Sequence, residues 1–373
     1  MRVGILTFHN AENFGAVLQA YALKTFLQNC GCDAQIIDYR NPAITAVYDI
    51  FNPRILLTRK NIFASLHQYF SRFRNLEDRR ICKKKYQDFR NTYLNLTKRC
   101  ASLKSLDIDF DRVIVGSDQV WNLHLTGGFD KNYFLDFVKK TGVKKISYAA
   151  SAEVDPCNLL AKHRDKVSVL LNDFDDLSVR EDFLIKELAC YTMKEISVCL
   201  DPTFLLDAET YRSLSEEVSH DKYVLVYHMT PIPEGALMAE SVARKNGWKV
   251  IEIHIGYGCG ESDERHKVNL GPLEILSYLV HAEEVFTSSF HGLALSLIMN
   301  KNVWVVDKGN NMRQRNLLSS LHLDNRLLSS NSFVDIPIDY SNVNKLLDLQ
   351  IKKSRDFLQE ALFRENGENS VLS

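Results

Sequence analysis

The stretch that decides the fold class is residues 2–39, RVGILTFHNAENFGAVLQAYALKTFLQNCGCDAQIIDY. Residues 2–8 are mostly apolar and predict a buried strand, which a polar loop at residues 9–15 follows. The next stretch, AVLQAYALKTFLQNCG, has apolar residues at helical spacing and ends on Gly31. Residues 34–39 predict a second strand. A strand, a helix and a strand in succession indicate a right-handed unit with parallel strands.

The same alternation continues along the chain in two series. The first series has predicted strands at residues 112–117, 145–149, 177–180 and 197–200. The second begins near residue 222 and alternates the strands YVLVYHM, KVIEIHI, EVFTS and NVWVVD with helices around 234–246, after Gly271-Pro272 and from about 291. Two such series predict an α/β protein with two Rossmann-like lobes that face a cleft.

The predicted domains follow from this division. We expect an N-terminal lobe over 1–200, a C-terminal lobe over 201–340, and a C-terminal helix and tail over 341–373. The segment 201–221 is the expected crossover. Residues 54–99 interrupt the alternation, because they are helical in pattern and hold thirteen Lys/Arg against three acidic residues.

Composition narrows the class of protein. A length of 373 residues fits about two domains, and a net charge of -1 gives no general reason to expect a nucleic-acid partner. The first residues resemble a strand rather than a signal peptide, and no apolar run approaches the roughly 20 residues of a membrane span. The eight cysteines form no CxxC pair and no zinc-ligand spacing. These features predict a cytoplasmic protein with reduced thiols.

Ligands of parallel α/β sheets bind beyond the carboxyl ends of the strands, which ranks the candidate residues. The strand EVFTS runs directly into a helix through Ser288, Ser289, Phe290, His291 and Gly292. Unpaired N–H groups and the helix dipole make such a junction an anion site. A histidine at this point is suited to contact phosphate or to act as an acid/base catalyst, and a role in capping or packing is the alternative.

Basic residues follow other strand ends. Arg180 ends the strand at 177–180, and the strand NVWVVD is followed by Lys308, Arg313 and Arg315. Lysine and arginine suit the recognition of phosphate and carboxylate groups, so we expect a site for an anionic ligand here. A surface ion pair for Arg180 and a solvated basic loop for the other three are the alternatives.

The first lobe offers polar groups for an acceptor. Its expected sugar-binding residues are His9, Asn10, Asn13, Gly15, Ser117, Trp121 and Asn122. Hydroxyl, amide and aromatic groups in this mixture bind the hydroxyls and faces of sugars. Asp118, in the same loop, is a candidate general base, with capping of a turn as the alternative. The loop at 9–15 lacks GxGxxG, so no dinucleotide fingerprint is present.

Two acidic clusters precede their strands and therefore lie at the wrong end of the sheet for a ligand. These are Asp107 with Asp109, which has the DxD spacing of many metal-dependent glycosyltransferases, and Asp173, Asp175 and Asp176. We therefore expect neither a metal site nor a bound cofactor.

Several landmarks in one order resemble the polysaccharide pyruvyl transferase family. They are RVGILTFHNAENFGAVLQAYAL, VIVGSDQVWN, ISYAAS, SVRE, LDPTFLL and LGPLEILSYLVHAEEVFTSSFHGLALSLIMNKN, which together cover most of residues 1–325. The resemblance implies a fold similar to that of GT-B glycosyltransferases. It also implies transfer of the enolpyruvyl unit of phosphoenolpyruvate to two hydroxyls of one sugar, which forms a cyclic pyruvate ketal.

The resemblance assigns roles to individual positions. His291 matches the acid/base or phosphate-contacting histidine, and Arg180 matches the arginine of the SVR motif, a donor ligand. Members of the family often carry arginine two residues before the histidine, where this chain has Ser289. Either Arg313 or Arg315 replaces that arginine, or the donor is not phosphoenolpyruvate.

The resemblance also suggests partners. Acceptors in such pathways are often lipid-linked sugars at the inner membrane face, and basic residues mixed with apolar ones favour an anionic bilayer surface. The insert 54–99 is therefore a candidate peripheral membrane contact. A helical subdomain that covers the cleft, or that forms a homodimer, is the favoured alternative. Two other functions stay open: a GT-B glycosyltransferase that uses a nucleotide sugar, and a non-catalytic sugar- or phosphate-binding partner in polysaccharide assembly.

Overall fold

The computed structural model describes residues 1–49, 76–100, 102–103, 109–152, 160–229, 233–254, 262–306, 309, 312–328, 333 and 335–364. Its first lobe is built on a six-stranded sheet with the order β2-β1-β3-β4-β5-β6. The strands are β1 (Arg2–Leu6), β2 (Asp33–Ile36), β3 (Arg112–Val115), β4 (Lys144–Ala150), β5 (Asp176–Val179) and β6 (Ile196–Val198). Every neighbouring pair is parallel, so all the carboxyl ends lie along one edge.

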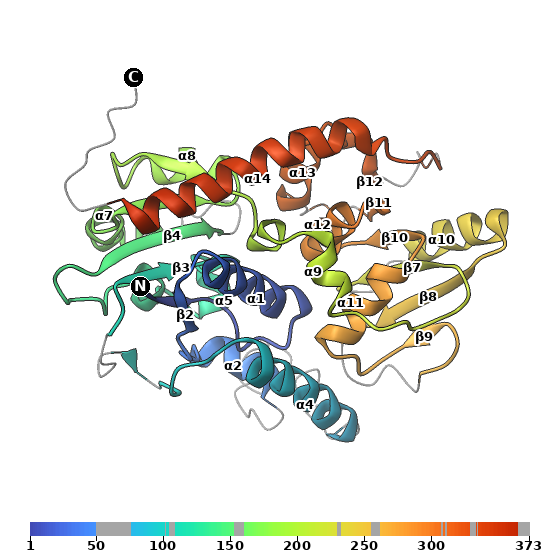
Figure 1. Ribbon diagram of the computed structural model, residues 1–373, viewed down its shortest axis with the longest axis horizontal. Coiled ribbons are helices and arrows are strands. Elements are labelled where there is room, and N and C mark those ends of the chain that lie inside the picture. Colours follow the sequence, from blue (N-terminus) through green and yellow to red (C-terminus); the bar gives the residue numbers. More distant parts are fainter. Residues whose placement is uncertain are drawn as a thin grey trace.

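The second lobe repeats this plan. Its six strands have the order β12-β11-β10-β7-β8-β9, and all neighbours are again parallel. They are β7 (Tyr223–His228), β8 (Lys249–His254), β9 (His266–Lys267), β10 (Glu284–Thr287), β11 (Asn302–Val306) and β12 (Leu327–Leu328). The prediction of two Rossmann-like lobes is therefore confirmed, and Figure 1 shows the two sheets side by side.

Helices connect the strands and cover the sheets (Figure 1). Those of the first lobe are α1 (Phe14–Asn29), α2 (Pro42–Tyr48), α4 (Leu76–Tyr93), α5 (Leu123–Thr126), α7 (Arg164–Asn172) and α8 (Phe183–Leu188). A 3-10 turn, η4 (Pro202–Leu205), and the short helix α9 (Ala208–Arg212) form the crossover. The second lobe has α10 (Pro233–Asn246), α11 (Pro272–His281), α12 (Phe290–Ile298) and α13 (Met312–Ser320), and α14 (Tyr340–Phe363) follows it.

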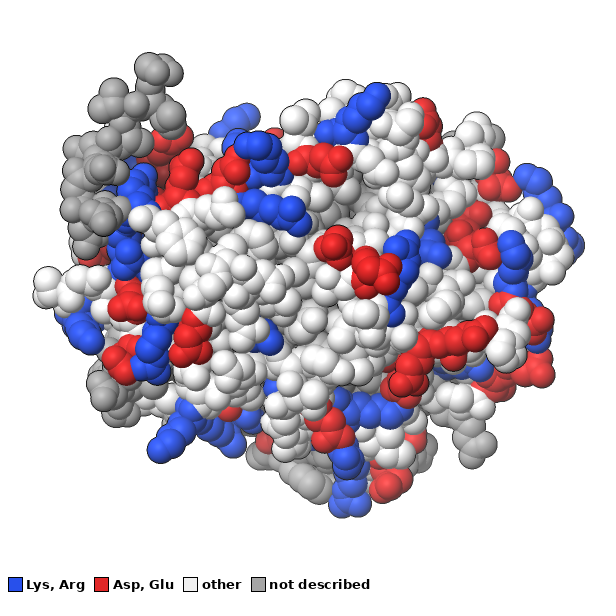
Figure 2. All heavy atoms as spheres, viewed as in Figure 1, with Lys and Arg blue, Asp and Glu red and all other residues white. Residues whose placement is uncertain are grey.

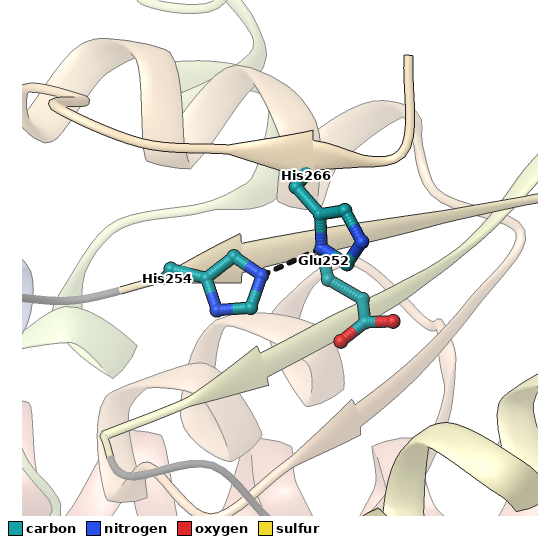
Figure 3. Close-up of side chains that lie close together, drawn as sticks. All are labelled: Glu252, His254 and His266. Carbon is teal, nitrogen blue, oxygen red and sulfur yellow. Dashed lines mark hydrogen bonds between the residues drawn. The ribbon is translucent and has the colours of Figure 1, made fainter. Parts of the chain in front are cut away.

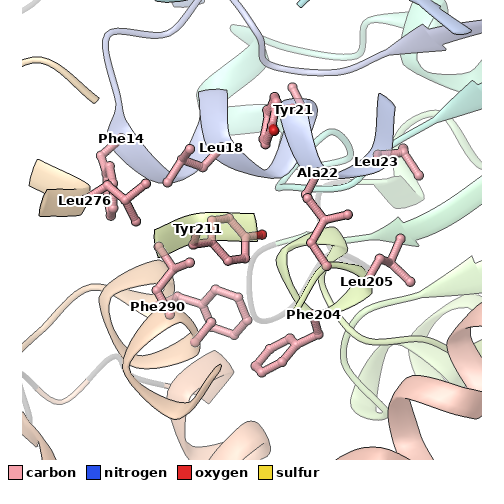
Figure 4. Close-up of a cluster of buried hydrophobic side chains, with 14 of the residues drawn as sticks. Phe14, Leu18, Tyr21, Ala22, Leu23, Phe204, Leu205, Tyr211, Leu276 and Phe290 are labelled. Carbon is pink, nitrogen blue, oxygen red and sulfur yellow. The ribbon is translucent and has the colours of Figure 1, made fainter. Parts of the chain in front are cut away.

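Helix α1 is buried along almost its whole length, because it lies between the two lobes. Its N-cap is Asn13, whose side-chain oxygen accepts a hydrogen bond from the Ala16 N–H. One hydrophobic cluster runs from α1 through η4 and α9 to α11 and α12, and Figure 4 shows Phe14, Tyr211 and Phe290 within it. The lobes thus share apolar core at this point, which holds the base of the cleft together.

Helix α14 runs across both lobes, as Figure 1 shows in red. Near its start, the Tyr340 hydroxyl donates to the carbonyl of Lys301 in the second lobe. Further along, the Ser354 hydroxyl accepts from the Leu200 N–H at 2.9 Å. The helix therefore fastens the second lobe to the end of the first, and it also bounds one of the cavities described below.

The interrupting segment is described only from Leu76 onward; residues 54–75 lie outside the described part. Helix α4 packs on α11 of the second lobe. Lys85 Nζ bonds the Asn269 carbonyl at 3.0 Å and Glu274 Oε1 at 2.6 Å. No helix in the described ranges has the length and apolar character to cross a membrane. In Figure 2, acidic and basic side chains are interspersed over the visible face.

The predicted strands agree with the structure, whereas several short helices and two edge strands were not predicted. Each predicted strand and helix that lies within the described residues is present within a few residues of its expected bounds. The unpredicted elements are helices α2, α5, α7, α8, α9 and α13 and the two-residue edge strands β9 and β12. Most of them are too short for a period to show. The two acidic clusters that the sequence analysis rejected as ligand sites do lie at the N-terminal ends of strands. Asp109 pairs with Arg2, and Asp173 pairs with Lys145. Asp107 lies outside the described residues.

Candidate active site

The junction between β10 and α12 has the geometry of a helix N-terminus. Ser289 is the N-cap, and its hydroxyl accepts from the Gly292 N–H at 3.2 Å. The Thr287 hydroxyl accepts from the Ser289 N–H at 3.0 Å. A Cβ on Gly292 would lie 2.6 Å from that Thr287 oxygen, so glycine is needed for this tight turn. These contacts fix the backbone of the first turn of α12, which carries His291.

His291 lies where the two lobes meet. The residue is only 6% exposed, and its Nε2 lies 3.5 Å from Oδ2 of Asp201. Its other ring nitrogen faces α1 of the first lobe, where a Cβ on Gly15 would come within 1.9 Å of Nδ1. Gly15 was predicted as an acceptor ligand. In the structure, its lack of a side chain leaves room for the imidazole of His291 between the lobes.

Asp201 is the buried acceptor at the centre of the site. Its Oδ2 lies 2.9 Å from Arg180 Nη1 and 3.3 Å from the Ser117 hydroxyl. Its Oδ1 accepts from the N–H and the hydroxyl of Thr203 at 3.0 and 2.9 Å. Burial by itself raises the pKa of Asp201, but the neighbouring His291 and Arg180 outweigh burial and hold the pKa well below its ordinary value.

Arg180 is held between two carboxylates and an aromatic ring. Its Nη1 bonds Asp201, and its Nε bonds Glu181 Oε1 at 2.8 Å. Its guanidinium carbon lies 4.3 Å from the centre of the Phe290 ring. Burial alone lowers the pKa of Arg180, but the two carboxylates reverse this and raise it. The remaining nitrogen, Nη2, is buried and has no hydrogen-bond partner within the described part of the chain.

Two cavities meet at this group. The His291 cavity has a volume of about 320 Å³ and lies between the lobes. Its polar lining consists of Asn13, Asp118, Gln119, Ser288, Ser289, His291, Arg313 and Gln314. The Arg180 cavity has a volume of about 260 Å³ and is bounded by α14. Its polar lining consists of Arg180, Glu181, Asp182, Asp201, Arg313, Asn316, Ser320, Gln350, Lys353 and Ser354. Phe290 and Arg313 line both cavities.

Arg313 is therefore the cation shared by both cavities. Burial, followed by the repulsion of Arg180, lowers its pKa, so a bound anion would relieve two neighbouring positive charges. Gln314 supports the same wall, because its Nε2 donates to the Ser288 carbonyl at 3.0 Å. Arg315 is exposed and does not line either cavity, and Lys308 lies outside the described residues.

Of the seven predicted acceptor residues, Asn13 lines the His291 cavity, as does the candidate base Asp118, whereas the other six line neither cavity. The Asp118 carboxylate also accepts from the Gln119 N–H at 2.8 Å. Ser117 lies behind the cavity wall, where its hydroxyl bonds the Ala149 carbonyl at 2.7 Å and Asp201. Asn10 is half-buried and its amide bonds the Thr45 hydroxyl at 3.4 Å.

The other predicted acceptor ligands, His9, Trp121 and Asn122, also line neither cavity. His9 is 0% exposed, and its two ring nitrogens face the Thr7 carbonyl and Asp38. Trp121 is core, because its Nε1 donates to the Tyr133 carbonyl and its ring stacks on Phe134. Asn122 is the N-cap of α5. The strand-end rule located their loops correctly but gave no information on which way each side chain turns.

The comparison with protein families agrees with this architecture. The sequence profile of the polysaccharide pyruvyl transferase family matches residues 13–310. The chain belongs to that family. The match includes the His291 junction, Asp201 and Arg180, and so covers both lobes of this pyruvyl transferase family member. No curated protein sequence matches the chain.

Solved structures of low sequence identity match the chain over most of its length. A UDP-GlcNAc 2-epimerase from Neisseria meningitidis bound to UDP-GlcNAc matches with a TM-score of 0.48 and 10% identity, over 98% of this chain and 100% of that one. A UDP-GlcNAc 2-epimerase from Methanocaldococcus jannaschii matches with a TM-score of 0.45 and 12% identity, over 95% and 94% of the two chains.

Two residues of the candidate site were not predicted. Asp201 lies in LDPTFLL and Glu181 in SVRE, so both belong to stretches that carried the family resemblance. Each is a carboxylate at least 99% buried. For Asp201, a charged residue inside an otherwise apolar stretch just after a strand was the available signal, because buried carboxylates need a cationic or hydrogen-bonded partner.

Proposed function

We propose that the protein transfers the enolpyruvyl unit of phosphoenolpyruvate to two hydroxyls of a sugar in a cell-surface polysaccharide precursor. The observation that carries the proposal is the group His291, Asp201 and Arg180, held at the junction of the lobes beside a cavity. An imidazole and a guanidinium that share one buried carboxylate can supply a proton and neutralise an anion in the same place.

The chemistry requires both capacities. Protonation at C3 of phosphoenolpyruvate makes C2 electrophilic, a sugar hydroxyl adds to C2 and loses its proton, and the C2–O bond to phosphate breaks. The second hydroxyl then adds to C2, also with loss of a proton, and closes the ketal. In our proposal His291 carries the proton, and Asp201 orients its ring and stabilises the charged form.

The donor's phosphate and carboxylate need cations, and the family's usual arginine before the histidine is Ser289 here. Arg313 lines the His291 cavity and is our candidate for the replacement. The first turn of α12 adds N–H groups at the positive end of the helix dipole. Arg180 contributes its positive charge from the adjoining cavity.

The acceptor would enter from the first lobe. Asn13, Asp118 and Gln119 line the wall of the His291 cavity opposite the second lobe. Carboxylate and amide groups bind sugar hydroxyls, and Asp118 is our candidate for the base that receives the hydroxyl proton. We propose a lipid-linked sugar as the acceptor.

The direct test is release of inorganic phosphate. The purified protein is incubated with phosphoenolpyruvate and a panel of sugar and lipid-linked sugar acceptors, and the product is examined for a pyruvate ketal. Phosphate release that depends on an acceptor supports the proposal. No release with any acceptor, together with turnover of a nucleotide sugar, overturns it in favour of a glycosyltransferase.

The assignment of Arg313 has its own matched control. Arg313→Met should raise the KM for phosphoenolpyruvate about tenfold or more, because a charge-assisted contact to the donor is lost. Arg315→Met removes a neighbouring exposed arginine and should leave the KM unchanged. Equal KM values for both variants and the native protein would exclude Arg313 as the donor cation.

A further inference from the structure

A cluster of two histidines and a glutamate lies on the outer strands of the second sheet, on elements that line neither cavity of the active site. Strands β8 and β9 pair in parallel with Glu252 opposite His266. Glu252 and His254 are two residues apart on β8, so their side chains point to the same face of the sheet. The ligand atoms of Glu252, His254 and His266 lie within 4.8 Å of one another.

The two imidazoles are turned toward each other, as the dashed line in Figure 3 marks. His254 Nε2 and His266 Nδ1 are 2.8 Å apart, which requires one nitrogen to donate a proton to the other. Two nitrogens bound to one tetrahedral zinc ion are separated by about 3.3 Å, given bond lengths near 2.0 Å. A small rotation of the rings would therefore place both nitrogens at bonding distance from one zinc ion.

The carboxylate has an oxygen to contribute. Both contacts from Arg265 to Glu252, at 2.7 Å from Nε and 2.5 Å from Nη2, fall on Oε1. Oε2 is thus the oxygen available to a cation. The arginine also favours the ionised carboxylate and fixes its orientation, in the manner of the groups that surround natural metal ligands.

The turn that carries His266 is fixed by its own hydrogen bonds. Asp263 Oδ1 accepts from the N–H groups of Arg265 and His266, at 2.8 and 2.6 Å. Both His254 and His266 are partly buried, and His254 also lines a cavity of about 170 Å³. The ligands therefore approach from two ordered strands rather than from a loose surface, which lowers the cost of organising them.

We propose that Glu252, His254 and His266 form a binding site for a divalent transition metal, with zinc as the ion that best fits two imidazoles and a carboxylate. Nitrogen ligands of this kind disfavour magnesium and calcium, which require oxygen. The sequence predicted no metal site, because the spacing of 252, 254 and 266 matches no common zinc motif. The proposal is independent of the pyruvyl transfer reaction.

Metal binding is measured directly on the full chain. The protein is stripped with EDTA, and Zn²⁺ is titrated in competition with a chromophoric chelator. We expect one ion per chain with micromolar affinity or tighter. His254→Gln and His266→Gln should each weaken binding at least 100-fold, whereas His220→Gln, an exposed histidine paired with Glu217, should have no effect.

A second measurement needs no substitution. Zn²⁺ should protect His254 and His266 of the native protein from diethylpyrocarbonate, as mapped by peptide mass spectrometry, while His220 stays reactive. Absence of stoichiometric binding by the native protein overturns the proposal. So does undiminished affinity in both glutamine variants, or modification of His254 and His266 at the same rate with and without Zn²⁺.

Discussion

Two clusters of a histidine, an aspartate and an arginine lie in the described part of the chain, and one of them lines the two cavities of the candidate site. In the first lobe, His9 Nε2 lies 3.0 Å from Asp38, which Arg40 also bonds at 2.7 Å. At the junction of the lobes, His291 lies 3.5 Å from Asp201, which Arg180 bonds at 2.9 Å. In both clusters the histidine and the arginine hold the pKa of the aspartate below its ordinary value, against the effect of burial.

The two clusters differ in whether the histidine ring is accessible from a cavity. Both nitrogens of His9 face oxygen acceptors, and its side chain is 0% exposed. His291 has one nitrogen near Asp201 and lines a cavity of about 320 Å³. A His–Asp–Arg group is therefore a structural element or a candidate catalytic one according to access, since its internal chemistry is the same.

The largest expected effect is on the reaction rate, and it separates the two histidines most clearly. His291→Gln should lower acceptor-dependent phosphate release by about 10²–10⁴-fold, the usual contribution of a general acid/base. His9→Gln should lower the amount of folded protein while the rate per folded molecule stays within about threefold, because His9 lines neither cavity of the candidate site. Steady-state assays normalised to folded protein measure both. A His291→Gln variant as active as the native protein would end the catalytic assignment.

The next effect is on stability. Asp201→Asn should lower the free energy of unfolding by about 3–5 kcal/mol, since it leaves Arg180 buried with one carboxylate partner. Asp38→Asn should cost less, about 1.5–3 kcal/mol, because Arg40 is partly exposed and can turn to water. Urea unfolding monitored by circular dichroism gives both values. Equal costs, or a larger cost at Asp38, would contradict the assigned difference in burial.

A third test uses pH. The pKa of Asp38 in the folded protein lies below its ordinary value of 3.8, so the ionised form stabilises the fold. That stabilisation is complete above about pH 4 and is lost as the pH falls toward the lower folded pKa. The stability advantage of the native protein over Asp38→Asn should therefore shrink between pH 6 and pH 2.5. An advantage that is constant over this range would show that the two pKa values do not differ.

The smallest effect concerns Gly15. Gly15→Ala should destabilise the protein by about 1–3 kcal/mol, because the new Cβ meets His291 Nδ1. The same change in a His291→Ala background should cost almost nothing, and the double-mutant cycle measures this coupling. Independent, additive costs would mean that the imidazole does not occupy the space beside Gly15.

Much of the architecture was predictable because it depends on local pattern. The spacing of apolar residues predicted the main strands and helices, and the rule that ligands meet strand carboxyl ends selected His291 and Arg180 and rejected Asp109 and Asp173. The same rule failed for His9 and Trp121. Both follow or adjoin strand ends, yet their rings turn into the core, because neighbours distant in sequence supply their partners.

The sequence by itself determined the alternation of strands and helices, the division into two series and the chemical groups available at each strand end. These properties depend on residues close together in the chain. Only the tertiary structure decided that Asp201 joins His291 and Arg180, that Gly15 makes room for the imidazole, and that Glu252 meets two histidines. Such contacts depend on how the lobes and strands pack, and a buried charge is stabilised only where that packing supplies its partner.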